Sequence, residues 1–152
     1  LINERIATAF ESDSSGKAAI GHGYTYSGHP VGAAAALAAI AETRRLDVVT
    51  NAAARGTQLY DGMVSLAGQY PVVGDVRGGH GLMTAMELVA DRETKAPIDG
   101  KLAIKMQKAA YQAGALIRVS GPNVILSPSL VIEEADIDIA LNAVEEGLKA
   151  IS

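Results

Sequence analysis

The sequence is organised around one glycine-punctuated stretch, GHGYTYSGHP at residues 21–30, which runs directly into an alanine-rich segment. Three glycines permit close backbone approach, and Thr25 and Ser27 offer hydroxyl donors. Pro30 suits the first position of a helix. Because a helix N-terminus presents unpaired N–H groups and the positive end of the helix dipole, it attracts anions. The stretch predicts an anion-binding loop before a helix, and a helix cap without a ligand is the alternative.

The composition is that of one soluble globular domain. The chain has 152 residues, of which 49% are hydrophobic and 20% charged. Its net charge of -4 disfavours nucleic acid and anionic membranes as partners. Cysteine is absent, which excludes disulfides and thiolate metal sites. No signal peptide is visible and no apolar run is long enough for a membrane span. We expect a cytoplasmic protein. The chain does not open on methionine, which suggests a processed or excised piece.

Apolar residues at helical spacing predict five helices. Asn3 and Asp47 stand where N-caps are expected for the first and third. Asn51, Arg55 and Gln58 fall on the face of the third helix that is expected to be exposed. The predicted helices follow Asn3, run from Pro30 to about Arg45, from Asp47 to about Gly68 and from Gly100 to Gly114, and include residues 137–151 near the C-terminus.

Four short apolar stretches bounded by turn residues predict strands, at residues 72–77, 82–89, 115–119 and 124–127. Glycines at 78–81 suit a hairpin or bulge between the first two strands, and Ser120–Asn123 suits a turn between the last two. Together with the helices, these strands predict an α/β protein of the α+β kind, in which helices pack on a small, mostly antiparallel sheet.

Two arginines are candidates for carboxylate binding. Arg118 lies in an apolar run, where a charge is costly to bury without a partner, and its planar fork suits a carboxylate. The structural alternative is a salt bridge from Arg118 to Glu87 or Asp75. For Arg77, in the sequence DVRG, an ion pair at the end of a strand is favoured.

Other site types find little support in the sequence. His22, His29 and His80 lack the spacing and the accompanying carboxylates of a metal site. Ser27 and Ser127 lack the strand-turn-helix context of a nucleophile elbow. The glycines at 21 and 23 do not complete a dinucleotide-binding fingerprint. Three lysines between residues 101 and 108 are typical of a solvated helix face.

The stretch at residues 21–36, GHGYTYSGHPVGAAAA, resembles the signature segment of class III aminotransferases. These pyridoxal-phosphate enzymes include the omega-amino acid:pyruvate transaminases. The resemblance covers nearly the whole chain. It continues through Val73–Gly78, Gly81–Met83, Met86–Leu88, the hairpin that carries Arg118, and Leu126–Pro128.

The resemblance implies a fold-type I homodimer, of which this chain would be the C-terminal third. Residues 1–27 would be the end of the large cofactor domain, and residues 28–152 the small domain. Thr25, helped by the backbone of Tyr24, would bind the cofactor phosphate of the other subunit. Arg118 would bind the substrate carboxylate and swing aside when the other substrate has none. The implied reaction moves an amino group from an amine or omega-amino acid to a 2-oxo acid such as pyruvate.

The departures from the family pattern are as informative as the matches. The family's Schiff-base lysine, and the aspartate that pairs the pyridine nitrogen, lie upstream of the point matching Leu1. No catalytic residue is therefore expected in this chain, and we expect the chain alone to be inactive. The connection after Arg77 looks one residue longer than usual, and Ser129 stands where a second proline is common.

Two alternatives stay open at this point. One is a non-catalytic α/β module that assembles or interacts with a partner polypeptide. The other is a class III relative with a different reaction, such as an aminomutase or a racemase, because the phosphate-binding threonine does not fix the reaction type.

Overall fold

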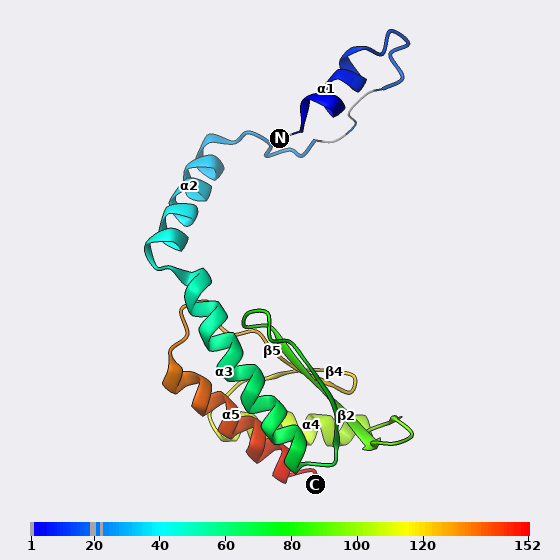
Figure 1. Cartoon of the computed structure of the whole chain (residues 1–152), viewed down its shortest axis with the longest axis vertical. Coiled ribbons are helices and arrows are strands. Elements are labelled where there is room, and N and C mark those ends of the chain that lie inside the picture. Colours follow the sequence, from blue (N-terminus) through cyan, green and yellow to red (C-terminus); the bar gives the residue numbers. More distant parts are fainter. Residues whose placement is uncertain (1, 19–20, 22) are drawn as a thin grey trace. The chain divides into compact units, whose positions relative to one another are not determined.

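The chain forms two compact units, Leu1–Ala41 and Glu42–Ser152. The computed structural model describes residues 2–18, 21 and 23–152. The division between the units falls inside helix α2 (Pro30–Arg45), drawn in light blue in Figure 1. It does not test the predicted boundary between residues 27 and 28, which concerns the domains of a larger enzyme and stays a prediction. In the described part of the chain, no helix combines the length and apolar character needed to cross a membrane.

The first unit contains helix α1 (Glu4–Glu11) and most of α2. As predicted, α1 begins after Asn3, whose side-chain oxygen accepts a hydrogen bond of 3.0 Å from the Ile6 N–H. Helix α2 begins at Pro30, also as predicted. Neither helix contains a buried residue.

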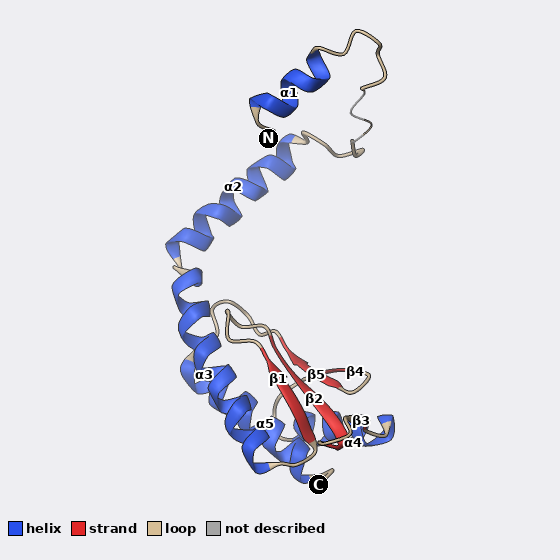
Figure 2. Ribbon diagram, turned by 45° about the vertical axis from the view of Figure 1, so that its right-hand side comes forward, coloured by secondary structure: helices blue, strands red, loops and turns tan. Residues whose placement is uncertain are grey.

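The second unit is built on an antiparallel sheet with the strand order β1-β2-β5-β4 (Figure 2). Both predicted hairpins are present, β1–β2 and β4–β5, and β2 pairs with β5 between them. A short extra strand, β3 (Ala96–Pro97), pairs with β2 and was not predicted, because two residues carry no alternating pattern. The other strands are β1 (Val73–Arg77), β2 (Thr84–Asp91), β4 (Arg118–Ser120) and β5 (Asn123–Leu126).

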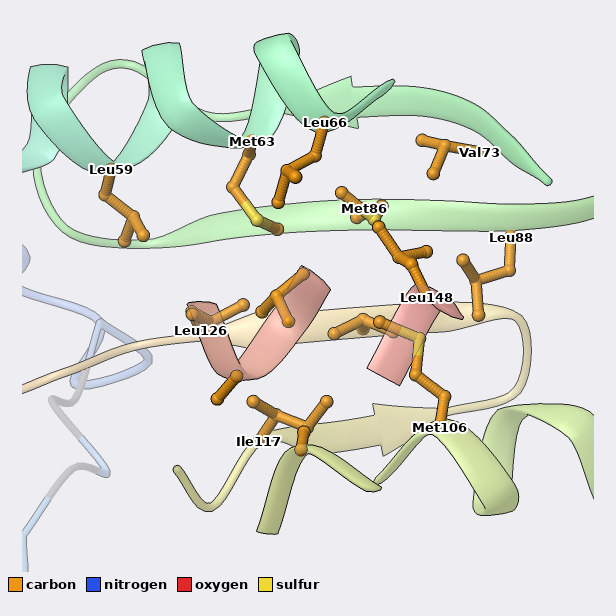
Figure 3. Packing of buried hydrophobic residues seen from close by; sticks show 14 of the residues in the cluster. Leu59, Met63, Leu66, Val73, Met86, Leu88, Met106, Ile117, Leu126 and Leu148 are labelled. Atoms are coloured by element: carbon orange, nitrogen blue, oxygen red, sulfur yellow. The ribbon is translucent and has the colours of Figure 1, made fainter. Parts of the chain in front are cut away.

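Helices α3 (Val48–Gln69), α4 (Gly100–Gln112) and α5 (Glu134–Lys149) supply the other half of the core. Their apolar faces pack against one face of the sheet, which confirms the predicted fold class. Figure 3 shows this core from close by. The buried side chains labelled there come from all three helices and from the sheet and its flanks: Leu59, Met63, Leu66, Val73, Met86, Leu88, Met106, Ile117, Leu126 and Leu148.

The prediction that Asp47 caps α3 is right about position and wrong about chemistry. Asp47 has a left-handed backbone with φ of 45°, and its side chain makes no capping hydrogen bond. Its carboxylate instead accepts a hydrogen bond of 3.0 Å from the Thr50 hydroxyl. The two helices α2 and α3 follow each other so closely that Asp47 must turn the chain sharply, and this backbone geometry takes the place of the extended one that N-caps usually have.

The expectation that Asn51, Arg55 and Gln58 lie on an exposed face is also wrong. These residues are half-buried and contact α5 or the segment that leads into it. Asn51 donates hydrogen bonds to the carbonyl oxygens of Leu130 (2.8 Å) and Ile132 (3.0 Å). Arg55 pairs with a carboxylate of α5 at 2.8 Å, and Gln58 donates to another at 2.9 Å. A polar pattern favours solvent exposure, whereas here these side chains join α3 to α5 and the segment before it.

Helix α3 packs closely on the turn between β1 and β2. Gly78, Gly79 and Gly81 have φ values of 151°, 85° and 100°, a backbone region that strongly favours glycine. A Cβ atom built on Gly56 of α3 would overlap the carbonyl group of Gly81 and lie 2.8 Å from its Cα. The absence of a side chain at Gly56 therefore allows the helix and the turn to touch.

We expect Gly56→Ala to lower the free energy of unfolding by about 1–3 kcal/mol, because helix and turn must separate to admit the methyl group. Gly68→Ala is the matched control, because Gly68 lies in the same helix and faces open space. That change is expected to raise the free energy of unfolding by about 0.5–1 kcal/mol through helix propensity alone. Urea unfolding followed by circular dichroism measures both, and a Gly56→Ala chain as stable as its parent would contradict the packing described.

Candidate functional site

The loop before α2 is a tight turn closed by two hydrogen bonds. The Ser27 N–H donates to the Tyr24 carbonyl oxygen at 2.9 Å, and the Tyr24 N–H donates to the Ser27 side-chain oxygen at 3.0 Å. Gly28 follows with φ of 72°. We expected the Ser27 hydroxyl to donate to an anion. In the structure, its oxygen accepts a hydrogen bond that stabilises the turn. Its two hydrogen bonds fix the backbone on either side of Thr25.

Thr25 lies inside this turn and is exposed. Its hydroxyl has no hydrogen-bond partner among the residues that the structure describes. Tyr24, next to it, is 72% exposed. Five residues after Thr25 the helix begins, and the His29 carbonyl accepts a hydrogen bond of 2.9 Å from the Ala33 N–H. A free hydroxyl near a helix N-terminus is a donor set that fits a phosphate group.

The histidines show no metal-binding arrangement in the described residues. His22 lies outside them. The rings of His29 and Tyr26 form a T-shaped pair with 5.8 Å between their centroids, and His80 lies in the β1–β2 turn. Within residues 2–18, 21 and 23–152, no three His, Asp or Glu side chains gather closely enough to hold a metal ion.

Arg118 lies at the start of the edge strand β4 and is exposed. It borders a cavity of about 410 Å³ whose other walls are mostly apolar and come from β5, the segment before β4 and the first half of α5. No acidic side chain pairs with Arg118 in the described part of the chain. The structural alternative for Arg118, a salt bridge to Glu87 or Asp75, is therefore wrong.

Both of those carboxylates belong to Arg77 instead. One guanidinium nitrogen of Arg77 donates to Asp75 at 2.9 Å and to Glu87 at 2.9 Å, and the other donates to the Asn123 side-chain oxygen. These hydrogen bonds raise the pKa of Arg77 above its usual value, and the one with Glu87 contributes most, followed by the one with Asp75. The ion pair expected for Arg77 is confirmed. The sequence did not reveal Asn123 as a third partner, because that contact depends on how β5 registers with β2.

The six lysines occupy exposed positions on turns and helices. Lys95 donates a hydrogen bond of 2.9 Å to the Gly74 carbonyl oxygen. Lys149 pairs with Glu146 at 2.8 Å and with Glu145 at 3.2 Å, and these partners raise its pKa well above the ordinary lysine value. A lysine that attacks an aldehyde must be neutral, so the environment of Lys149 opposes that chemistry.

The structure brings Tyr24 and Thr25 together in one turn of the first unit, and it places Arg118 in the second unit. The proposed phosphate contact and the proposed carboxylate contact are thus carried by separate compact parts of the chain. Their assigned roles stay predictions.

The chain matches the family model described as aminotransferase class III over residues 1–148. The chain belongs to the class III aminotransferase family. Members of this family are enzymes, and the predicted family resemblance is confirmed.

Solved and curated class III relatives agree with this placement. An amine transaminase from an uncultivated Pseudomonas species, solved with pyridoxal phosphate bound, is 39% identical with a TM-score of 0.91, and the match covers 100% of this chain and 34% of that one. The taurine–pyruvate aminotransferase of Bilophila wadsworthia is 37% identical over 84% of this chain and 29% of its own length. The leucine/methionine racemase of Thermococcus litoralis is 35% identical over 85% of this chain and 29% of its own length.

This class III chain spans about a third of the length of the relatives that it matches. A structural match that covers the whole chain and one third of its neighbour confirms that the fold is that of one part of a transaminase subunit.

Proposed function

We propose that this chain is the C-terminal part of a pyridoxal-phosphate-dependent aminotransferase. The enzyme would move an amino group from an amine or omega-amino acid to a 2-oxo acid such as pyruvate. The observation that carries the proposal is the end-to-end structural match to an amine transaminase at 39% identity. Residues 1–27 would belong to a large cofactor domain, and the partners would be that domain and a second subunit of a homodimer.

In this proposal, Thr25 and the backbone of Tyr24 bind the phosphate of the cofactor held by the other subunit. The free Thr25 hydroxyl and the fixed turn around it support the assignment. Because the turn is already closed by Ser27, little backbone freedom is lost when the hydroxyl engages an anion. Bound pyridoxal phosphate would supply the electron sink that amino-group transfer needs.

Arg118 binds the substrate carboxylate in the same proposal. Its guanidinium is exposed and has no acidic partner among the described residues, so its fork is available to a ligand. A bidentate contact fixes the orientation of a carboxylate as well as its position, which is how this arginine would align the substrate.

The similarity to a leucine/methionine racemase supports a second candidate, a class III enzyme that inverts an amino acid without transferring its amino group. Formation of a new amino acid from pyruvate separates the two, because a racemase changes only the configuration of its substrate. A non-catalytic assembly module is the third candidate, and it would show no cofactor absorbance in the native assembly.

We expect the 152-residue chain alone to have no transaminase activity, because the family resemblance implies that the Schiff-base lysine lies outside this chain. The test incubates the purified chain with pyridoxal phosphate, an amine donor and pyruvate, and measures alanine by chromatography. A saturable change in cofactor absorbance is likewise not expected. Alanine formed above the protein-free control would refute the expectation.

Thr25→Val removes the hydroxyl and keeps the shape of the side chain. In the assembled holoenzyme we expect the dissociation constant of pyridoxal phosphate to rise about 10- to 100-fold, as for the loss of one hydrogen bond to a charged group. Equilibrium dialysis with absorbance detection measures it, and Thr25→Ser, which keeps the hydroxyl, is the control. Equal affinity of the Val and Ser variants would exclude the phosphate contact.

Arg118→Met removes the charge and keeps much of the length of the side chain. The KM for pyruvate is expected to rise about 10- to 100-fold, while the KM for an amine donor without a carboxylate stays unchanged. Steady-state kinetics of the holoenzyme with both substrates measures the difference. If both KM values move together, Arg118 acts on the fold and not on the carboxylate.

A further inference from the structure

The open face of the sheet, opposite the helices, carries two neighbouring rows of side chains. The register places Arg77 beside Ala85, Ala85 beside Ile125, and Ile125 beside Arg118. Side chains directly opposite each other in antiparallel strands share a face, so both arginines point to the same side. The next row on that face, two residues along each strand, is Asp75, Glu87, Asn123 and Ser120.

This face therefore holds two cations and two anions, yet they do not pair one to one. Arg77 contacts both carboxylates, at 2.9 Å each, and Asn123 as well. Arg118 contacts neither carboxylate. Arg77 thus pairs with both carboxylates of this face, and Arg118 pairs with neither.

We propose that Arg77 is a positioning residue that keeps the guanidinium of Arg118 available to a ligand carboxylate, by occupying Glu87, the acid of this face that could otherwise reach Arg118 and compete for it. The inference rests on the proposed function of Arg118. It adds a specific task for a salt-bridge network that would otherwise count only as surface stabilisation, where such pairs are worth little.

The spacing of the sheet makes this competition possible. Glu87 lies two strands away from Arg118, about 10 Å across the sheet, and is displaced by two residues, about 7 Å along the strand. Extended arginine and glutamate side chains on the same face can bridge the resulting diagonal. A carboxylate tethered at that range would be a permanent competitor for a substrate carboxylate.

Arg77→Met in the holoenzyme tests the proposal. The KM for pyruvate is expected to rise about two- to sixfold, since an exposed intramolecular ion pair now competes with the substrate. Neither kcat nor the KM for an amine without a carboxylate is expected to change. Lys105→Met is the matched control, because it removes the same charge from an exposed site on α4 and should leave every constant unchanged.

Rescue separates positioning from general support of the fold. The triple variant Arg77→Met/Asp75→Asn/Glu87→Gln removes the competing Glu87 carboxylate, and also the Asp75 carboxylate that would be left without its partner. It should return the KM for pyruvate to within twofold of the parent. If Arg77 only supports the fold, the triple variant stays impaired, and the proposal is overturned.

Ser120→Glu tests whether a nearby carboxylate competes for Arg118 while the ion pairs of Arg77 stay intact. Ser120 is exposed and lies two residues from Arg118 on the same face of β4. The new carboxylate should raise the KM for pyruvate as Arg77→Met does, even if Arg77→Met proves too unstable to assay. An unchanged KM would mean that a nearby carboxylate does not compete for Arg118, which would also overturn the proposal.

Nuclear magnetic resonance gives a readout that needs neither cofactor nor activity. In the 152-residue chain, the Nε–Hε signal of Arg118 should shift in Arg77→Met and return in the triple variant, and a signal that does not move counts against the proposal.

The kinetic outcomes separate the proposed function of Arg118 from the positioning role of Arg77. If Arg118→Met leaves the KM for pyruvate unchanged, the proposed function of Arg118 fails; if only Arg77→Met has no effect, this inference alone fails.

Discussion

The register between β2 and its neighbours β1 and β5 is the constraint on which most of the second unit depends. Since the side chains of a strand alternate between faces, a slip of one residue would exchange the two faces completely. If β2 slipped, Met86 would leave the core and Ala85 would take its place. The contacts of Arg77 with Glu87 and Asn123 exist only in the observed register. Core packing and the charge arrangement of the open face are therefore fixed by the same backbone hydrogen bonds.

The first unit has a different energetic basis, because α1 and α2 contain no buried residue. Val31 and Leu37 of α2 are 70% and 69% exposed. Full burial of one such side chain stabilises a fold by about 1.5–3 kcal/mol, so this segment has much to gain from a covering surface. That agrees with the proposal that the turn at Thr25 acts in an assembled dimer and not in an isolated chain.

Much of the fold could be predicted because local sequence patterns indicate its helices, strands and turns. The heptad-like spacing of α5, proline at the start of α2 and the glycines between β1 and β2 each indicated the right structure. The errors concern contacts between distant segments. Asn51 looked solvent-facing because local sequence cannot show that the carbonyl groups before α5 lie above it. The candidate site divides in the same way. The motif alone singles out Thr25. The lack of an acidic partner for Arg118 depends on the pairing of Arg77 with Asp75 and Glu87, which local sequence does not show.

The methionines of this chain are divided sharply by the core. Met63, Met86 and Met106 come from three different elements and are completely buried, whereas Met83 is 72% exposed. Because thioethers oxidise according to their access to solvent, mild peroxide would modify Met83 first and reach the other three only when the core opens. The four methionines of the chain thus form a natural footprinting set, with one internal reference and three reporters of global opening.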